Sequence, residues 1–337
     1  MRVPYPQLHD TLARVLRGLG FAPDDADLCA RLFAEASRDG VASHGLNRFP
    51  RFVQAVRDGV VDPRVSAERV SGAGPLERWD GRRGPGNLNA HRCMERAITL
   101  AREHGIGCVA LANTNHWMRG GSYGWQAADA GVIGICWTNT MPNLPPWGAS
   151  DPRLGNNPLV VAVPRGGAHV VLDMAMSQFS MGALESYRRR GEALPVPGGF
   201  DRDGEPTRDP AAIEESGRLL PIGYWKGSGL ALVLDMVAAI LAGGLATHQV
   251  PSDPARESGL SQLFLALDPA HLGGAGEAER VADEIVGHLQ APDGGGEPVR
   301  YPGERTLRTR EESLRLGVPV DPEVWARVLA EDADAGG

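Results

Sequence analysis

The segment Ser43–Arg48 (SHGLNR) places a hydroxyl, an imidazole and a guanidinium within six residues, between two expected helices. A histidine can exchange a proton near neutral pH. An arginine can bind a carboxylate through two parallel hydrogen bonds. His44 and Arg48 together suit a substrate that carries a carboxylate beside a carbonyl group. The alternative is that Ser43 caps a turn and Arg48 is a solvated surface charge.

A second polar loop, residues 113–125 (NTNHWMRGGSYGW), follows an expected strand and precedes an expected helix. Ligands of α/β proteins usually bind at the carboxyl ends of strands. A loop this rich in donors and aromatic rings is costly to bury without a ligand or a partner. The loop is therefore a candidate binding site, and the alternative is a structural turn from strand to helix.

Two further segments could contribute a charge to the same site. Asp173 ends an apolar stretch, where an acid can orient a histidine, although it could instead cap a helix. In residues 223–229 (GYWKGSG), Lys226 lies among small residues where a helix begins. An ammonium group, backbone N–H groups and the helix dipole together bind an anion such as a pyrophosphate. The alternative for Lys226 is simple exposure to solvent.

The elements that must position these residues can be predicted from apolar spacing. Apolar residues recur every three or four positions in the first 60 residues and in the last 30, which predicts helices at both ends. Short β-rich stretches and helices alternate between them, so we expect an α/β (α+β) fold. The expected strands are 107–112, 132–138, 159–163, 170–172 and 262–267; the later helices are 230–241, buried, and 278–289, amphipathic.

Composition excludes several classes of protein. The chain has 337 residues and a net charge of −8, which argues against a nucleic-acid binder with a basic face. The longest strongly apolar stretch, 230–242, is interrupted by Asp235, so no membrane span is expected. The N-terminus lacks the apolar core of a signal peptide. The four cysteines lie far apart and suit free thiols, so we expect a cytoplasmic protein without a disulfide framework.

Common nucleotide and metal motifs are missing from the sequence. There is no G-x-G-x-x-G, no G-x-x-x-x-G-K-[ST], no G-x-S-x-G and no H-E-x-x-H. The missing motifs therefore argue against four classes of protein: standard Rossmann dehydrogenases, P-loop nucleotidases, α/β-hydrolases and zincins. The nine histidines are mostly isolated, and no metal site is expected.

Six segments in register nevertheless resemble one family. They are S-H-G-x-x-R-x-P, N-H-W-M-R-G-G-S-Y-G-W, P-P-W-G-A, G-N-N-P, V-L-D-M-A-M-S and G-Y-W-K-G-S-G. Their order and spacing, over about residues 1–330, resemble the malate/L-lactate dehydrogenase family, which is unrelated to the Rossmann-type lactate and malate dehydrogenases. The resemblance implies a homodimer with a non-Rossmann nicotinamide-binding domain built on a mixed sheet. A helical domain built from both chain ends would accompany it.

The resemblance implies roles for particular residues. His44 would donate the proton to the reduced carbonyl oxygen, Arg48 would hold the substrate carboxylate, and Asp173 would support the histidine or the substrate-side network. Ser43 and His116 would belong to the substrate pocket. The stretches that match the cofactor contacts of the family are His169, Val170, Val171, Leu172, Asp173, Met174 and Ala175, then Trp225 and Lys226, and finally Gly303, Glu304 and Arg305.

The resemblance also implies a domain division and a reaction. We expect a helical part at 1–70, a nicotinamide-binding part at 71–225, and a return to the helical and dimerisation part at 226–337. The Trp-rich loop resembles that of members that reduce the C2 carbonyl of a 2-keto sugar acid, with NADH as the expected cofactor and NADPH as the alternative. The alternatives are another small 2-keto acid, a cyclic imino acid, or a binding protein that has lost its chemistry, although His44, Arg48 and Lys226 are all present.

Overall fold

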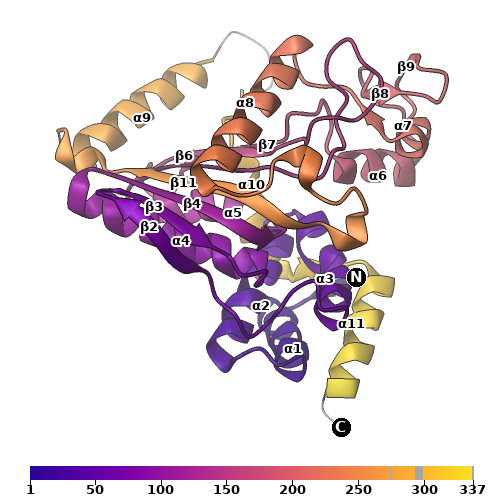
Figure 1. Cartoon of the computed structure of the whole chain (residues 1–337), viewed down its shortest axis with the longest axis horizontal. Coiled ribbons are helices and arrows are strands. Elements are labelled where there is room, and N and C mark those ends of the chain that lie inside the picture. The colour runs from indigo at the N-terminus through magenta and orange to yellow at the C-terminus, as the bar shows by residue number, and fades with distance from the viewer. Residues whose placement is uncertain (274, 293–298, 336–337) are drawn as a thin grey trace.

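A seven-stranded mixed sheet forms the centre of the molecule (Figure 1). The computed structural model describes residues 1–273, 275–292 and 299–335. In order across the sheet, the strands are β2 (Glu68–Ala73), β3 (Leu76–Asp80), β4 (Ile106–Asn115), β11 (Ser258–Leu267), β5 (Ile133–Thr138), β6 (Leu159–Val163) and β7 (Val170–Met174). Only β3 and β4 run parallel, and every other neighbouring pair of this sheet is antiparallel. The expected mixed α/β fold is confirmed.

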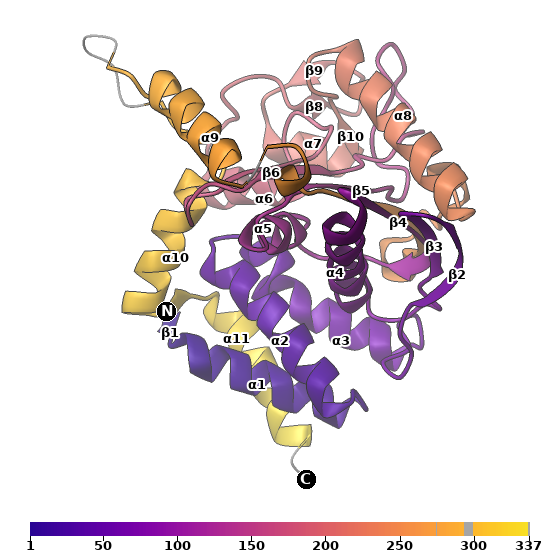
Figure 2. The ribbon, with the colours of Figure 1, turned by 90° about the vertical axis from the view of Figure 1, so that its left-hand side faces the viewer.

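Helices cover both faces of this sheet (Figure 2). On one face, α4 (Gly86–His104) and α5 (Gly121–Asp129) pack on the strands through an apolar cluster that includes Met94, Trp117 and Phe264. On the other face lies α8 (Trp225–Ala242), with α6 (Met181–Arg190) and α7 (Pro210–Ser216) beyond it. Residues 195–221 are rich in glycine and proline. They contain α7 and a small sheet of β8 (Gly199–Phe200), β9 (Pro206–Thr207) and β10 (Arg218–Leu219).

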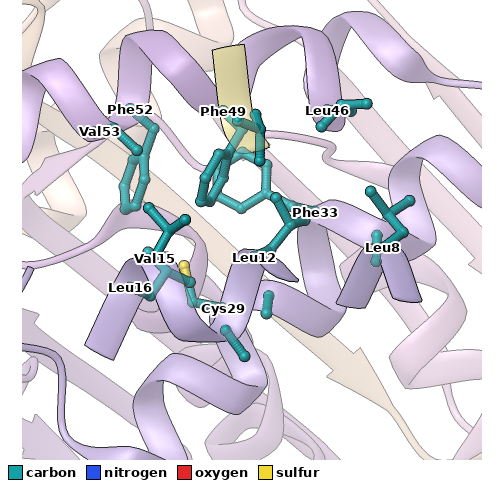
Figure 3. Close-up of a cluster of buried hydrophobic side chains, with 14 of the residues drawn as sticks. Leu8, Leu12, Val15, Leu16, Cys29, Phe33, Leu46, Phe49, Phe52 and Val53 are labelled. Atoms are coloured by element: carbon teal, nitrogen blue, oxygen red, sulfur yellow. The ribbon is translucent and has the colours of Figure 1, made fainter. Parts of the chain in front are cut away.

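The two ends of the chain meet in a helical layer below α4 and α5 (Figure 2). It contains α1 (Tyr5–Gly18), α2 (Pro23–Arg38), α3 (Phe49–Arg57) and α11 (Pro322–Ala335), with α10 (Glu304–Leu316) beside it. The pairing of β1 (Arg2–Val3) with β12 (Val318–Pro319) joins the ends directly. Figure 3 shows the apolar side chains that α1, α2 and α3 bury against one another. A helical unit from both ends is thus present, as expected.

Strand β11 departs from the expected domain division. Residues 226–337 were assigned to the helical part, yet β11 lies between β4 and β5, with Leu263 opposite both Ala110 and Trp137. Leu263 and Phe264 are 3 % and 0 % exposed on opposite faces of the sheet. A strand that is apolar on both faces is suited to the interior of a sheet whose two faces are both covered. A boundary at residue 226 therefore does not separate the sheet from the helical layer.

Helix α8 is only half buried, although its sequence predicts a buried helix. Leu234, Ala238 and Ala242 pack against the sheet, but Met236 is 52 % and Ile240 is 66 % exposed. By length and hydropathy alone, this is the one helix among the described residues that could cross a membrane. Its one acidic residue, Asp235, is buried and accepts hydrogen bonds from the side chain of Asn139 and the backbone of Thr247.

The last elements complete the chain. Helix α9 (Ala275–Leu289) projects from the body on one side of the molecule (Figure 2). The four cysteines, Cys29, Cys93, Cys108 and Cys136, are free thiols.

Candidate active site

The Ser43–Arg48 segment forms two short 3-10 helices, η1 (Ala42–His44) and η2 (Leu46–Arg48), which follow α2. Leu46 is 1 % exposed and anchors the segment in the apolar cluster of Figure 3. The backbone N–H of Leu46 also donates to Ser37 Oγ of α2 at 2.7 Å. A Cβ atom on Gly45 would lie 2.2 Å from that oxygen, so only glycine fits here. This packing holds the segment rigidly on α2 and places His44 and Arg48 beside the sheet.

The rings of His44 and His116 stack on each other, with centroids 5.7 Å apart and planes 17° apart. Ser43 Oγ lies 3.2 Å from His44 Nδ1. The backbone N–H of Met118 donates to His116 Nδ1 at 3.0 Å, so a neutral His116 carries its proton on Nε2. Ser43, His44 and His116, all predicted from the sequence, are therefore brought together.

The pKa values of both imidazoles lie below the ordinary value of histidine. Burial, and then the positive charges of Arg48 and Arg119, lowers the pKa of His44 to about 4. Burial, Arg48 and His44 hold the pKa of His116 well below its ordinary value. To act as the proton donor, His44 would therefore have to take up a proton when the substrate binds. A bound carboxylate would offset the charge of Arg48 and favour the protonated ring.

The two histidines open into a pocket of about 430 Å³ that extends along the end of β7. Besides Ser43, His44 and His116, its walls include Trp117, Arg119, Gly121, Trp125, Thr138, Thr140, Asn156, Val171, Leu172, Asp173, Ala175, Ser180, Gly303 and Thr306. Arg48 is not among them. It lines an adjoining cavity of about 80 Å³, which shares His116 and Met118 with the larger pocket. His116 thus forms the wall between the two.

A buried acid accompanies Arg48 in the smaller cavity. Glu257 Oε2 lies 3.9 Å from a terminal nitrogen of Arg48, and the Glu257 side chain is 7 % exposed. Burial raises the pKa of Glu257, whereas the hydrogen bond from the Met141 backbone and the charge of Arg48 oppose that shift. Arg48 therefore has a weak partner, which leaves its guanidinium able to bind a second carboxylate.

Asp173 reaches the pocket from the end of β7. Its carboxylate accepts a hydrogen bond of 2.8 Å from the backbone N–H of Gly121, at the start of α5. The residue is exposed to the pocket, and the walls of the pocket surround its carboxyl group. Desolvation by the surrounding protein raises the pKa of Asp173, and the charge of Arg119 and the Gly121 N–H oppose the shift.

Two glycines line the pocket at points where the surrounding protein leaves no room for a side chain. A Cβ atom on Gly121 would lie 2.8 Å from Asp173 Oδ2. Gly303 has φ +100°, and a Cβ atom there would lie 3.0 Å from the carbonyl of His169 and 3.1 Å from the amide of Val171. Bare backbone, polar Thr and Asn side chains and a long cleft fit the ribose, phosphate and amide groups of a nicotinamide cofactor. Among the described residues, no cluster of three or more His, Cys, Asp or Glu could hold a metal.

The whole chain, and not only this pocket, is similar to known proteins. A family model described as malate/L-lactate dehydrogenase matches residues 3–329.

The chain belongs to the malate/L-lactate dehydrogenase family.

Three relatives, each named for a different activity, are similar to the chain over nearly its whole length. The 2,3-diketo-L-gulonate reductase of Citrobacter koseri is 46% identical over 334 residues, which are 98% of this chain and 100% of that protein. The solved sulfolactate dehydrogenase of Methanocaldococcus jannaschii has a TM-score of 0.92 at 30% identity, covering 100% of this chain and 98% of that one. The Δ1-piperideine-2-carboxylate reductase of Pseudomonas syringae has a TM-score of 0.86 at 29% identity, covering 98% and 99%.

The structure places only some of the predicted cofactor residues on the pocket. Val171, Leu172, Asp173, Ala175 and Gly303 line it. Val170, Met174, Glu304 and Arg305 do not line it, and Thr306 contributes where Glu304 and Arg305 were expected.

His169 lies behind the pocket, because its side chain is used elsewhere. Its Nδ1 accepts the backbone N–H of Arg165 and its Nε2 lies 3.1 Å from Asp129. What His169 offers the site is the carbonyl that packs against Gly303.

Trp225 and Lys226 also lie away from the pocket in this single chain. Both are exposed at the start of α8, and Trp225 is 66 % exposed. The preceding turn is nevertheless joined to the end of β7, because Ile222 donates its backbone N–H to the carbonyl of Met176.

Several lining residues were not singled out from the sequence. Arg119 and Trp125 belong to the loop 113–125, and Asn156 belongs to the G-N-N-P segment, so position within a polar motif could have found them. Thr138, Thr140 and Ser180 carry no comparable signal. Thr138 and Thr140 enter the site because the start of β6 lies between the ends of β5 and β7, and Ser180 enters it as the N-cap of α6.

Proposed function

We propose that this chain is an NAD(P)H-dependent reductase of a 2-keto sugar acid, which converts 2,3-diketo-L-gulonate to 3-dehydro-L-gulonate. The observation that carries the proposal is the placement of His44 and Arg48 in consecutive 3-10 helices, beside two adjoining cavities that share His116. The similarity over the full chain to a protein with this activity in its name supports the substrate. A second candidate is another small 2-keto or cyclic imino acid, which the similarity to the Δ1-piperideine-2-carboxylate reductase favours.

Each residue near the histidines then has a task. Arg48 binds the substrate carboxylate, and that negative charge raises the pKa of His44 from its low value in the free protein. His44 thereby takes up a proton and donates it to the carbonyl oxygen that becomes a hydroxyl. Ser43 and His116 hydrogen-bond the substrate or orient His44, and Asp173 supports the polar network at the end of β7. The reduced nicotinamide, when bound, supplies the hydride.

We further propose that NADH is preferred to NADPH. The 2′-phosphate of NADPH is usually recognised by an arginine or lysine. Among the described residues that line the pocket, Arg119 is the one lysine or arginine, and it already pairs with Asp39 at 2.6 Å. A pocket whose cation is already paired suits the uncharged ribose of NADH.

The exposed face of α8 supports a homodimer. Leu232, Val233, Met236 and Ile240 are 47 %, 52 %, 52 % and 66 % exposed, and they lie on one side of the helix. Contiguous apolar surface of this kind marks interaction sites. A second copy of the chain would cover it, and the family resemblance implies active sites near that interface. Free thiols agree with the cytoplasmic location that we propose.

Steady-state kinetics tests the proposal. The purified enzyme is offered 2,3-diketo-L-gulonate, pyruvate, oxaloacetate and Δ1-piperideine-2-carboxylate, each with NADH and with NADPH, and absorbance of the reduced cofactor is followed. We expect the highest kcat/KM for the diketo acid with NADH. A higher kcat/KM for one of the smaller acids would establish the second candidate, and a preference for NADPH would refute the cofactor argument.

A further inference from the structure

A buried carboxylate behind the pocket binds three arginines. Asp39, the residue that follows α2, has a side chain that is 1 % exposed. Its carboxylate accepts hydrogen bonds from Arg38 at 2.8 Å, from Arg310 at 2.9 and 2.8 Å, and from Arg119 at 2.6 Å. Burial works against the ionised form, but the hydrogen bond from Arg310 and the charges of Arg119 and Arg38 outweigh it. The pKa of Asp39 is therefore well below its ordinary value.

These arginines come from three separate parts of the chain. Arg38 ends α2, Arg310 lies in α10, and Arg119 lies in the pocket loop between β4 and α5. Arg310 also stacks on the ring of Trp125, a pocket residue, at 4.5 Å. Asp39 thus joins the helical layer to the wall of the pocket.

Arg119 lies between two carboxylates but pairs with only one of them. It is 6 % exposed, and its Nε atom has no hydrogen-bond partner among the described residues. Gly121 lies beside both Arg119 and Asp173: a Cβ atom there would lie 3.4 Å from Arg119 Nε and 2.8 Å from Asp173 Oδ2. Without Asp39, the nearest carboxylate in the pocket for this guanidinium would be Asp173.

We propose that Asp39 is a positioning residue of the site: by pairing with Arg119, it keeps that guanidinium out of an ion pair with Asp173 and reduces its field at His44. This inference rests on the proposed reductase function for its second part only. An Arg119–Asp173 ion pair would cross the floor of the pocket at Gly121 and obstruct the cofactor. The groups that face His44 are Ser43, His116, Arg48 and Arg119, so the charge of Arg119 bears directly on its protonation.

Asp39→Asn tests the first part without any substrate. We expect NADH to bind roughly tenfold more weakly, measured by titration of the cofactor fluorescence, because Arg119 then pairs with Asp173. In Asp39→Asn/Arg119→Met the competing guanidinium is gone, and NADH affinity should return to within about twofold of that of Arg119→Met alone. Arg119→Met does not strand Asp39, which keeps Arg38 and Arg310.

The pH dependence tests the second part. If protonated His44 is the donor, kcat/KM falls as pH rises through the pKa of His44. Asp39→Asn removes a negative charge and should move this fall to lower pH, so kcat/KM at pH 7 drops roughly threefold to tenfold. Arg119→Met removes a positive charge and should move the fall to higher pH. A merely structural role for Asp39 would not shift the profile in opposite directions.

A matched control exists on the far part of the sheet. Glu77 of β3 is also 1 % exposed and also holds two arginines, Arg69 and Arg96, yet it does not line the pocket. Glu77→Gln should lower the thermal midpoint while leaving NADH affinity and the pH profile unchanged.

Three results would overturn the proposal. They are unchanged NADH affinity in folded Asp39→Asn, additive losses in the double variant, and a tenfold loss of NADH affinity in Arg119→Met, which would make Arg119 itself a cofactor ligand. If Asp39→Asn does not fold, a tenfold loss of NADH affinity in Arg119→Met, or a pH profile that Arg119→Met leaves unshifted, still overturns the proposal. A wild-type protein that binds NADH but reduces none of the keto acids refutes the proposed function and leaves the binding test valid.

Discussion

Arg48→Met is the most informative test of the proposed substrate site. Methionine keeps an unbranched apolar stem but removes the guanidinium. The Arg48 side chain is 24% exposed, so a carboxylate bound to it is only partly hydrated. At about 4 Å and an effective dielectric constant of about 20, the pair attracts by about 4 kcal/mol. Residual exposure and desolvation reduce the net loss to about 2–3 kcal/mol, which predicts a rise in KM of roughly 30- to 150-fold for the keto acid.

The loss of Arg48 also affects Glu257, which must be separated from the effect on substrate. Burial raises the pKa of Glu257 and Arg48 opposes this, so removal of Arg48 raises that pKa further. This change favours the protonated, neutral form of Glu257 over an unpaired buried charge. Arg48→Met/Glu257→Gln mimics that neutral state, and we expect it to have the same high KM as Arg48→Met. Recovery of the wild-type KM in the double variant would show that the single variant suffers only from the unpaired acid.

The assay compares two affinities in the same protein. KM for 2,3-diketo-L-gulonate comes from absorbance of NADH, and Kd for NADH comes from fluorescence titration. We expect the KM to rise by the factor above and the Kd to stay within about twofold, because Arg48 lies outside the larger pocket. Equal losses of both affinities would refute the assignment of Arg48 to the substrate carboxylate.

Three further predictions concern the proton donor, the anchored loop and the dimer. His44→Ala should lower kcat by roughly 10²- to 10⁴-fold, measured at saturating substrate, with NADH binding intact; near-normal turnover would exclude it as the donor. Ser37→Ala leaves the buried N–H of Leu46 without its acceptor and should lower the free energy of unfolding in urea by about 1–3 kcal/mol, and an unchanged midpoint would mean that the loop is held by other contacts. Met236→Glu places a charge on the exposed apolar face of α8 and should convert a dimer to monomers in sedimentation velocity, whereas an intact dimer would place the interface elsewhere.

Local pattern was sufficient for most of the individual elements. The recurrence of Leu8, Leu12, Val15 and Leu16 places apolar side chains on one face of a helix, and these residues are buried in the structure. The strands 159–163 and 170–172 were predicted from short β-rich stretches, and they form β6 and most of β7. Such patterns succeed because the period of the backbone dictates which side chains share a face.

The same reasoning failed where burial depends on distant neighbours. Helix α8 is apolar on nearly every side, which predicts a buried helix, yet Val233, Met236 and Ile240 are exposed in the single chain. An apolar helix face indicates that this face is buried against something, but the sequence does not show whether the partner is the same chain or another. Likewise, Lys226 has the surroundings of an anion site in the sequence, but the fold leaves it outside the pocket.

The sequence by itself determined the chemistry that is available to this protein. Ser43, His44, Arg48, His116 and Asp173 could be named from residue types, spacing and family resemblance, and the structure gathers them around adjoining cavities. Only the tertiary structure decided that burial and neighbouring arginines lower the pKa of both histidines. It alone also paired Arg48 with Glu257 and gave Arg119 and Arg310 to Asp39. These contacts join residues 209, 80 and 271 positions apart, and no local periodicity reports them, because they depend on how β11 and α10 pack against the rest of the chain.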